Sequence, residues 1–331
     1  MKFPRRQFLS LAAGAVALPA VSRNGRSQYQ SYPARPIRLV VPAPPGGVFD
    51  LLGRPLADKF KSLMGTVVIE NIGGGGGSLA ASAVAHALPD GYMLLLGGTV
   101  THVNEALLKK RPLYDPVKEL TPISIVATGF FSIAIHPSVS AQTLKQFIDY
   151  ARANRGKLFY GHAGVGTINH LTGELFKSLI GTPEIVQVPY RGAGPAISDL
   201  ISGQIAMAVV ALTAQVFELH RSGKIRVLAV TSRKRLAAAP ELLTAAEAGL
   251  PQLTVTQSLG LLAPAGTPKP IIDQIAQATK TALSDPTFQN KLIELGLEPV
   301  LDSSPVSFRR SLEDDIASWK PIVNAINLKI D

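Results

Sequence analysis

The sequence predicts an α/β fold of two lobes, with a parallel-rich sheet in each lobe and a two-strand hinge. Strand-like and helix-like segments alternate along most of the 331 residues, which is typical of βαβ units and parallel sheets. Gly65, Gly181 and Gly223 each stand just before a strand-like segment, where glycine commonly ends a helix. Two long strand-like runs break the alternation, and we interpret them as the crossings between the lobes.

The expected elements follow a polar linker at 24–31. In the first part of the chain we expect strands at 37–43, 66–72 and 92–98, and helices at 50–65 and 78–88. In the second part we expect strands at 157–164, 185–192, 205–212 and 225–232, and helices at 143–154, 169–181, 196–203 and 216–223. Each part is expected to supply the sheet of one lobe.

The two long runs lie at 120–139, where Gly129 interrupts the apolar residues, and at 253–266. If the chain leaves the first lobe near Gly129 and returns near Thr254, its C-terminal helical part completes the first lobe. We therefore expect lobe 1 to contain residues 31–129 and 254–331, and lobe 2 to contain residues 130–253.

Residues 1–22 have the pattern of an export signal. Adjacent Arg5 and Arg6 precede an apolar stretch at 8–20, which is shorter than the roughly 20 residues of a membrane span. The run Arg-Arg-Gln-Phe-Leu matches the core of the twin-arginine consensus. We expect export to the periplasm, with cleavage after Ser22; the alternative is a buried N-terminal helix.

Composition excludes several kinds of site. The chain has no cysteine, so disulfides, thiolate metal sites and cysteine nucleophiles are excluded. The six histidines have no metal-binding spacing and no G-x-S-x-G motif occurs, so we expect no metal, no cofactor and no catalytic residues. The formal net charge is +10, but the basic residues are scattered, which favours small anions over nucleic acid as partners.

Five consecutive glycines at 73–77 lie between a strand-like and a helix-like segment. This is where a phosphate-binding loop would stand, but a Walker motif needs a lysine after its last glycine, and Ser78, Leu79 and Ala80 follow here. We interpret this glycine run (residues 73–77) as a connection.

Four glycine-rich turns follow strand-like segments, at 43–50, 97–104, 161–170 and 189–196. In open α/β sheets, ligands bind outside the carboxyl ends of the strands, and the helices that follow point N–H groups at them. Glycine also allows close approach of the backbone, although strand-to-helix turns use it for structural reasons as well. The four turns together predict a binding cleft.

Seven segments give the chain a specific resemblance. In order they are YPARPIRLVVPAPPGG, PDGYMLLLG, YDPVKELTPIS, HLTGELFKSLIG, VPYRGAGPAISDLISGQI, GKIRVLAVTS and GLLAPAGTPKPII. They follow the pattern of the Bug-type (TctC-like) extracytoplasmic solute receptors of tripartite tricarboxylate transporters, over almost all of the chain beyond the signal.

The resemblance implies a Venus flytrap fold with the ligand between two lobes, no enzymatic activity, and a small organic carboxylate as ligand. It also implies membrane permease subunits as partners, and we expect a monomer. The family's ligand loops correspond to residues 44–50 and 163–170, with N–H groups of Gly46, Gly47, Gly164 and Gly166 as the carboxylate anchor. The candidate ligand-binding residues are Pro45, Gly46, Gly47, Phe49, Asp50, Thr99, Thr101, His102, Ala163, Gly164, Gly166, Thr167, Asn169, Tyr190, Arg191 and Val210.

Three departures from the family pattern bear on the ligand. Val48 and Phe49 replace small or hydroxylated residues of the first loop, and the second loop carries His162, Val165 and Asn169 where the family usually keeps small or hydroxylated residues. The third departure is at positions that are acidic or Asn in many members and are here Ala206, Val210 and Ala211. If these side chains face the cleft, an aromatic or aliphatic carboxylate is preferred over an α-amino acid or citrate.

Two other functions remain open from the sequence. One is a secreted α/β hydrolase, which would bring a serine, a histidine and an acid within hydrogen-bond reach. The other is a ligand-sensing receptor for a signalling partner. Which carboxylate is bound, and whether a matching permease exists, the residues do not say.

Overall fold

The computed structural model describes residues 32–330, so the expected signal and its cleavage site lie outside the described residues. From Pro33 onward the described residues form one unit by their mutual contacts. Within this unit the strands join in the order β2-β1-β3-β9-β4-β7-β5-β6, with β8 and β10 paired to β4. This is the α/β architecture that the alternating segments predict.

Lobe 1 is built on the sheet that begins with β1 (Ile37–Val41). This strand pairs in parallel with β2 (Val67–Asn71) and β3 (Met93–Gly98), and β3 pairs antiparallel with β9 (Thr256–Pro264). The other elements of lobe 1 are α1 (Val48–Met64), η1 (Gly75–Gly77), α2 (Ser78–Ala85), α3 (Thr99–Val103), η2 (Asn104–Leu108), α8 (Lys269–Leu283), α9 (Pro286–Glu294), β10 (Glu298–Pro299) and α10 (Pro305–Ala325). The core of this lobe includes Val40, Leu95, Leu262 and Phe308.

Lobe 2 is built on a second sheet in which β5 (Phe159–His162) pairs in parallel with β6 (Val186–Pro189) and β7 (Met207–Ala211). Its strand β8 (Arg226–Val230) pairs antiparallel with β4. Its helices are α4 (Leu144–Ala153), α5 (Ile168–Ile180), α6 (Ala193–Ile201) and α7 (Ala214–Arg221).

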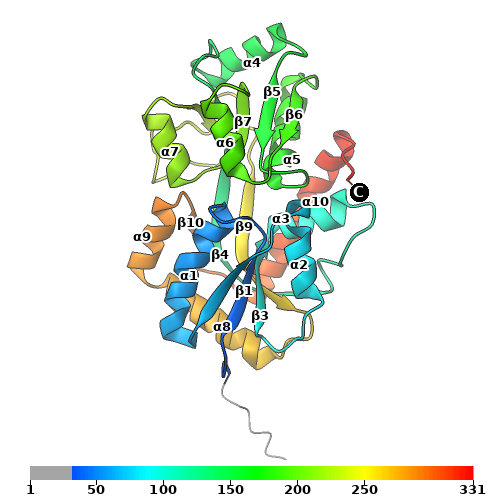
Figure 1. Cartoon of the computed structure of the whole chain (residues 1–331), viewed down its shortest axis with the longest axis vertical. Helices are drawn as coiled ribbons and strands as arrows, with labels where there is room; N and C mark the ends of the chain where they lie inside the picture. The colour runs from blue at the N-terminus through cyan, green and yellow to red at the C-terminus, as the bar shows by residue number, and fades with distance from the viewer. Residues whose placement is uncertain (1–31, 331) are drawn as a thin grey trace, which may run out of the picture. The chain divides into compact units, whose positions relative to one another are not determined.

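Strand β4 (Leu120–Ile135) belongs to both sheets. Up to Phe130 it pairs with β9, and from Phe131 onward it pairs with β7 and β8. In Figure 1, β4 and β9 run between the two groups of elements. The partner change lies between Phe130 and Phe131, close to Gly129, and β9 begins two residues after Thr254. The two long runs are thus the strands between the lobes. The predicted lobe boundaries stay a prediction.

Local signals explain where several helices begin. Thr143 and Gln146 form a capping box at α4, Thr167 caps α5, and Asp285 caps α9. Helix α1 differs, because its N-cap is Gly47, which has no side chain to cap it. Among residues 32–330, no helix is long and apolar enough to span a membrane.

Candidate functional site

The first predicted ligand segment, residues 44–50, runs into α1. Its loop together with Ala43, residues 43–47 (the lobe-1 loop), is held by the carboxylate of Asp50 in the first turn of that helix. Asp50 is 2% exposed and accepts hydrogen bonds from Gly46 N (2.9 Å), Arg54 Nε (2.9 Å) and Asn71 Nδ2 (3.0 Å). Asn71 Nδ2 also donates to Ala43 O at 3.0 Å. Burial alone raises the pKa of Asp50, but the hydrogen bonds from Arg54, Gly46 and Asn71 outweigh it, so the pKa is lowered and the group is ionised at neutral pH.

The second predicted ligand segment, residues 163–170, continues into α5. Its loop, residues 163–167 (the lobe-2 loop), lies between two buried histidines, His162 and His170. Their rings stack with centroids 4.5 Å apart. His162 Nδ1 accepts from Gly164 N at 3.2 Å, and His170 Nδ1 accepts from Gly166 N at 3.3 Å. Thr167 Oγ1 donates to Gly164 O (2.7 Å) and accepts from His170 N (3.3 Å) at the start of α5.

Both histidines are neutral, because burial lowers their pKa values. The pKa of His170 falls to about 3, through burial first and then the neighbouring His162 and Lys177. The pKa of His162 is also lowered by burial, against the opposing hydrogen bond to Gln187. A neutral imidazole keeps one nitrogen as an acceptor, which the N–H groups of this loop use.

The structure brings the loops of the two lobes together at two places. A methyl group added at Gly192, after β6, would lie 2.9 Å from Pro44 Cγ of the lobe-1 loop. A methyl group added at Gly76, in the glycine run, would lie 3.0 Å from Val165 O and 2.9 Å from Gly166 C of the lobe-2 loop. The lobe-1 loop, the glycine run and the lobe-2 loop therefore meet where the two lobes face each other.

All four N–H groups predicted to anchor a carboxylate have an acceptor within the protein. Gly46 N donates to Asp50, Gly47 N donates to Pro44 O (3.2 Å), and the Gly164 and Gly166 N–H groups donate to the histidines. The N–H groups of the first helical turn are the ones a helix leaves unpaired. At α1 these follow Gly47 without a side-chain cap, so they are the better-placed donors on lobe 1.

Three candidates on the turn after β3 lie in the interior of lobe 1. Thr99 is fully buried; its Oγ1 donates to Asp315 Oδ2 (2.6 Å) and lies 3.0 Å from Ser258 Oγ. Burial raises the pKa of Asp315 to about 6. Thr101 Oγ1 and His102 Nδ1 both bond to Gly98 O, at 3.0 and 3.1 Å. Their side chains are hydrogen-bonded within lobe 1 and do not join the two loops.

The remaining candidates are divided between loop and core. Arg191 is exposed next to Gly192, and Tyr190 OH donates to Asp199 Oδ2 at 2.6 Å. Asn169 Nδ2 donates to Val209 O at 3.3 Å. Pro45 is exposed, Ala163 is half-buried, and Phe49 is 5% exposed within α1.

Val210 lies in the hydrophobic core of lobe 2 with Phe130 and Leu200, fully buried. Its neighbours along the chain, Ala206 and Ala211, are half-buried and buried. The preference for apolar carboxylates therefore receives no support from Val210, because a core side chain does not contact a ligand between the lobes.

Asn104 is the residue that sequence reasoning missed. Its Nδ2 donates to Gly75 O (2.6 Å), Gly76 O and Ser78 Oγ (both 3.2 Å), which fixes the glycine run. Its Oδ1 is buried without a hydrogen-bond partner among the described residues. Asn104 ends the predicted turn at 97–104, but its contact with the glycine run, almost 30 positions earlier, leaves no local signal.

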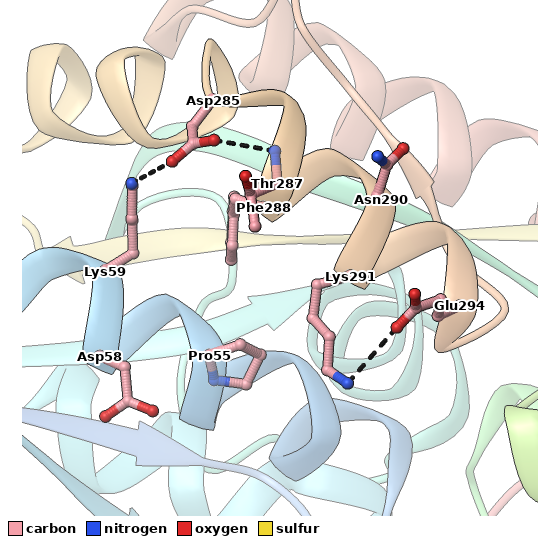
Figure 2. Close-up of a pocket in the computed structure, with 9 residues that line it drawn as sticks. All are labelled: Pro55, Asp58, Lys59, Asp285, Thr287, Phe288, Asn290, Lys291 and Glu294. Atoms are coloured by element: carbon pink, nitrogen blue, oxygen red, sulfur yellow. Dashed lines mark hydrogen bonds and ion pairs between the residues drawn. The ribbon is translucent and has the colours of Figure 1, made fainter.

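A separate open groove of about 610 Å³ lies between α1 and α9 on lobe 1 (Figure 2). Its lining includes Pro55, Phe288 and the ion pair of Lys59 with Asp285. None of the predicted site residues lines it. Within residues 32–330, no group of three or more His, Cys, Asp or Glu side chains is arranged to hold a metal ion.

Comparison with known proteins identifies the family. Residues 53–328 match the family model described as the tripartite tricarboxylate transporter family receptor. The chain is similar to the solved structure of the periplasmic binding protein BugD, at 31% identity and a TM-score of 0.84, covering 90% of this chain and 99% of that one.

Two further similar structures hold ligands. Rpa4515 of R. palustris, solved with adipate, has 33% identity and a TM-score of 0.85, covering 90% of this chain and 99% of that one. MatC from Rhodopseudomonas palustris, with bound malate, has 30% identity and a TM-score of 0.82, covering 88% of this chain and all of that one. The two-lobed fold is that of periplasmic binding proteins, and the chain belongs to the family of tripartite tricarboxylate transporter receptors.

Proposed function

We propose that this protein captures a small organic carboxylate between its two lobes and delivers it to the membrane subunits of a tripartite tricarboxylate transporter. Family membership supports the receptor role. The observation that carries the ligand class is the placement of two glycine loops, one from each lobe, each followed directly by the N-terminus of a helix of more than ten residues. Gly192 links them, because it faces Pro44 of the lobe-1 loop and its N–H group donates to Ala163 O of the lobe-2 loop at 3.1 Å. Helix N-termini favour anions through unpaired N–H groups and the helix dipole.

On lobe 1, the first-turn N–H groups of α1 are the proposed donors. On lobe 2, the Gly164 and Gly166 N–H groups make only long hydrogen bonds to neutral imidazole nitrogens, at 3.2 and 3.3 Å. A carboxylate is a stronger acceptor than a neutral imidazole, so it competes for these two donors directly or through water. Arg191, exposed beside Gly192, adds positive charge near the contact with Pro44.

We further propose that the protein binds its ligand without catalysing a reaction. A hydrolase would need a serine, a histidine and an acid in one place. Two Ser–His pairs occur among residues 32–330, His136 with Ser138 (2.7 Å) and His86 with Ser82 (3.4 Å). Both are local contacts on exposed segments, and neither histidine has a hydrogen bond or ion pair to a carboxylate in the described part of the chain.

The family and the N-terminal pattern both support a periplasmic location. Because similar proteins are periplasmic binding proteins and residues 1–22 have an export pattern, we propose a periplasmic receptor exported through its twin-arginine signal. We further propose a monomer that does not bind nucleic acid, with lobe 1 comprising 31–129 and 254–331 and lobe 2 comprising 130–253. The scattered basic residues support attraction of small anions.

A thermal-shift screen of the protein without its signal tests the proposal. Adipate, malate, benzoate, aspartate and citrate cover aliphatic, hydroxylated, aromatic, amino and tricarboxylic acids. A ligand at about 100 times its Kd stabilises the folded state by about 2.7 kcal/mol, which the melting temperature reports. We expect at least one of these carboxylates to raise it, whereas their neutral amides leave it unchanged. No shift with any acid, or equal shifts with the amides, would contradict carboxylate capture.

A further inference from the structure

The glycine run touches the opposite lobe, although the sequence predicts only a connection. Gly76 has φ +66°, and its Cα faces the backbone of Val165 and Gly166 so closely that a methyl group there would lie 2.9–3.0 Å from their carbonyl groups. Real side-chain carbons almost never approach other atoms so closely, so only glycine at 76 permits this contact. The run therefore brings bare backbone of lobe 1 against bare backbone of lobe 2.

Asn104 holds the glycine run in place for this contact. Three hydrogen bonds from its Nδ2 hold the glycine run and the start of α2, which fixes its Oδ1 on the other side. A methyl group added at Gly166 would lie 2.9 Å from this Oδ1, which is buried and has no partner among residues 32–330. An unpaired buried acceptor costs stability, so this atom opposes closure and offsets part of what the surrounding contacts contribute.

The end of the chain contributes a third contact. Ile330 pairs with the segment after η2: its N–H donates to Leu108 O at 3.0 Å, and its carbonyl accepts from Lys110 N at 3.1 Å. A methyl group at Gly166 would lie 3.0 Å from Ile330 Cδ1. The backbone pairing thus places the Ile330 side chain against the lobe-2 loop.

We propose that Gly76, Asn104 and Ile330 form an interlobe latch that closes on Val165 and Gly166 and sets the fraction of receptor in the closed form. The latch rests on the proposed function, since it matters for a receptor that encloses its ligand. It acts through closure: apparent affinity falls in proportion to the fraction of molecules able to close. Its residues need not touch the ligand.

The chain offers a matched pair of variants, Gly76→Ala and Gly75→Ala. Both glycines lie in η1 with similar positive φ, +66° and +60°, so the backbone strain of an added methyl group is the same. At Gly75 the atoms nearest to the methyl group belong to Ser78 and Leu79 of lobe 1, at 3.4–3.9 Å. At Gly76 it meets the lobe-2 loop and Asn104 Nδ2. Only Gly76→Ala should disturb closure.

Two readouts separate the latch from ligand binding. Because the chain has no cysteine, Lys61→Cys on α1 and Lys145→Cys on α4, both exposed, accept spin labels for a distance measurement between the lobes without any ligand. We expect Gly76→Ala to lengthen this distance relative to Gly75→Ala, and to weaken binding of the acid found by the screen by about tenfold if closure falls tenfold. Equal distances in the two variants overturn the latch.

Ile330→Ala tests the latch independently if Gly76→Ala fails to fold. It removes the side chain that meets Gly166 and leaves the backbone pairing with Leu108 and Lys110 in place. We expect a longer distance between the lobes and weaker binding with an unchanged unfolding midpoint. Unchanged distance and affinity contradict the latch. If the unaltered receptor binds no acid, the proposed function fails, while the distance measurement still decides the latch.

Discussion

The lobe-1 loop and the lobe-2 loop have similar sequences of small residues, but opposite kinds of group hold them. An ionised carboxylate, Asp50, accepts the N–H group of the first loop and is itself paired with Arg54. Two neutral imidazoles, His162 and His170, accept the N–H groups of the second loop. A negative charge lies directly behind the loop of lobe 1, whereas none of the groups bonded to the lobe-2 loop is charged.

An ionised carboxylate such as Asp50 can lie next to a loop proposed to bind an anion if its charge is compensated by neighbouring groups. Asp50 accepts from three donors, one of which is the cation of Arg54, so its charge is compensated locally. The histidines achieve the same bracing without charge, because burial keeps them neutral. The two loops should therefore respond differently to substitution and to pH.

Removing the carboxylate of lobe 1 should have the largest effect. Asp50→Ala removes the buried carboxylate that accepts from Gly46 N, Arg54 Nε and Asn71 Nδ2, the last of which keeps only Ala43 O. We expect a loss of roughly 2–4 kcal/mol in the free energy of unfolding, measured by urea titration. The control is Asp58→Ala, an exposed acid on the same helix, which should change stability by less than about 0.5 kcal/mol. Equal effects of the two changes would show that Asp50 does not brace the loop.

In lobe 2, the neutral state of His170 should instead be visible in the pH dependence of the free energy of unfolding. His170 has a pKa of about 3 in the folded state against an ordinary value of 6.5, so below pH 6.5 the unfolded chain binds a proton that the folded chain refuses. Stability is complete above pH 6.5 and falls as the pH falls. Relative to His170→Asn, which can still accept from Gly166 N, the unaltered protein should lose about 2 kcal/mol between pH 7 and pH 5.

Urea titrations of both proteins at several pH values measure this difference. Asp315, with its pKa raised to about 6, acts in the opposite direction, because its folded form takes up a proton first as the pH falls. It is present in both proteins and cancels in the comparison. A stability difference that stays constant from pH 7 to pH 5 would mean that His170 is not held neutral.

The smallest effect concerns the start of the two helices. Thr167 caps α5 and bonds to Gly164 O, whereas Gly47 gives α1 no side-chain cap. Thr167→Ala should lower the free energy of unfolding by about 1 kcal/mol, and Thr167→Ser, which keeps the hydroxyl, should lower it much less. If serine and alanine are equally destabilising, the lost methyl group and not the cap is responsible.

Most of the fold could be predicted from the sequence, because the alternation of segments and the two long strands are local patterns. The details of the site could not. All five residues of β7 are buried, so both of its faces are covered and no periodicity could tell that Val210 belongs to the core. Thr99 bonds to Asp315, more than 200 positions away, which turned a candidate ligand residue into an interior one.

Gly47 and Gly166 differ in what a substitution there would disturb. From the sequence, Gly47 and Gly166 are equivalent positions at which a bulky side chain should abolish binding. At Gly166, φ is +82° and an added carbon would meet Asn104 and Ile330, so a substitution there disturbs the lobes even without a ligand. At Gly47 the backbone is extended, with φ −71° and ψ 161°, which other residues adopt. An added carbon there would lie 3.1 Å from Ala43 Cβ and 3.2 Å from Pro44 O, so it disturbs the lobe-1 loop and not the contact between the lobes. Gly47 is therefore the better probe of the ligand.

We propose that the two loops enclose a carboxylate. Calorimetric titration of Gly47→Val with the acid found by the thermal-shift screen measures whether the lobe-1 loop is needed to bind it. The unaltered protein is one reference, and Gly194→Ala is the other, since its added methyl group on α6 has no atom within 4 Å. We expect one binding site in both references. In a Gly47→Val protein with a normal unfolding transition we expect binding weakened at least about 100-fold, or about 2.7 kcal/mol. Equal affinity in all three proteins would contradict this proposal.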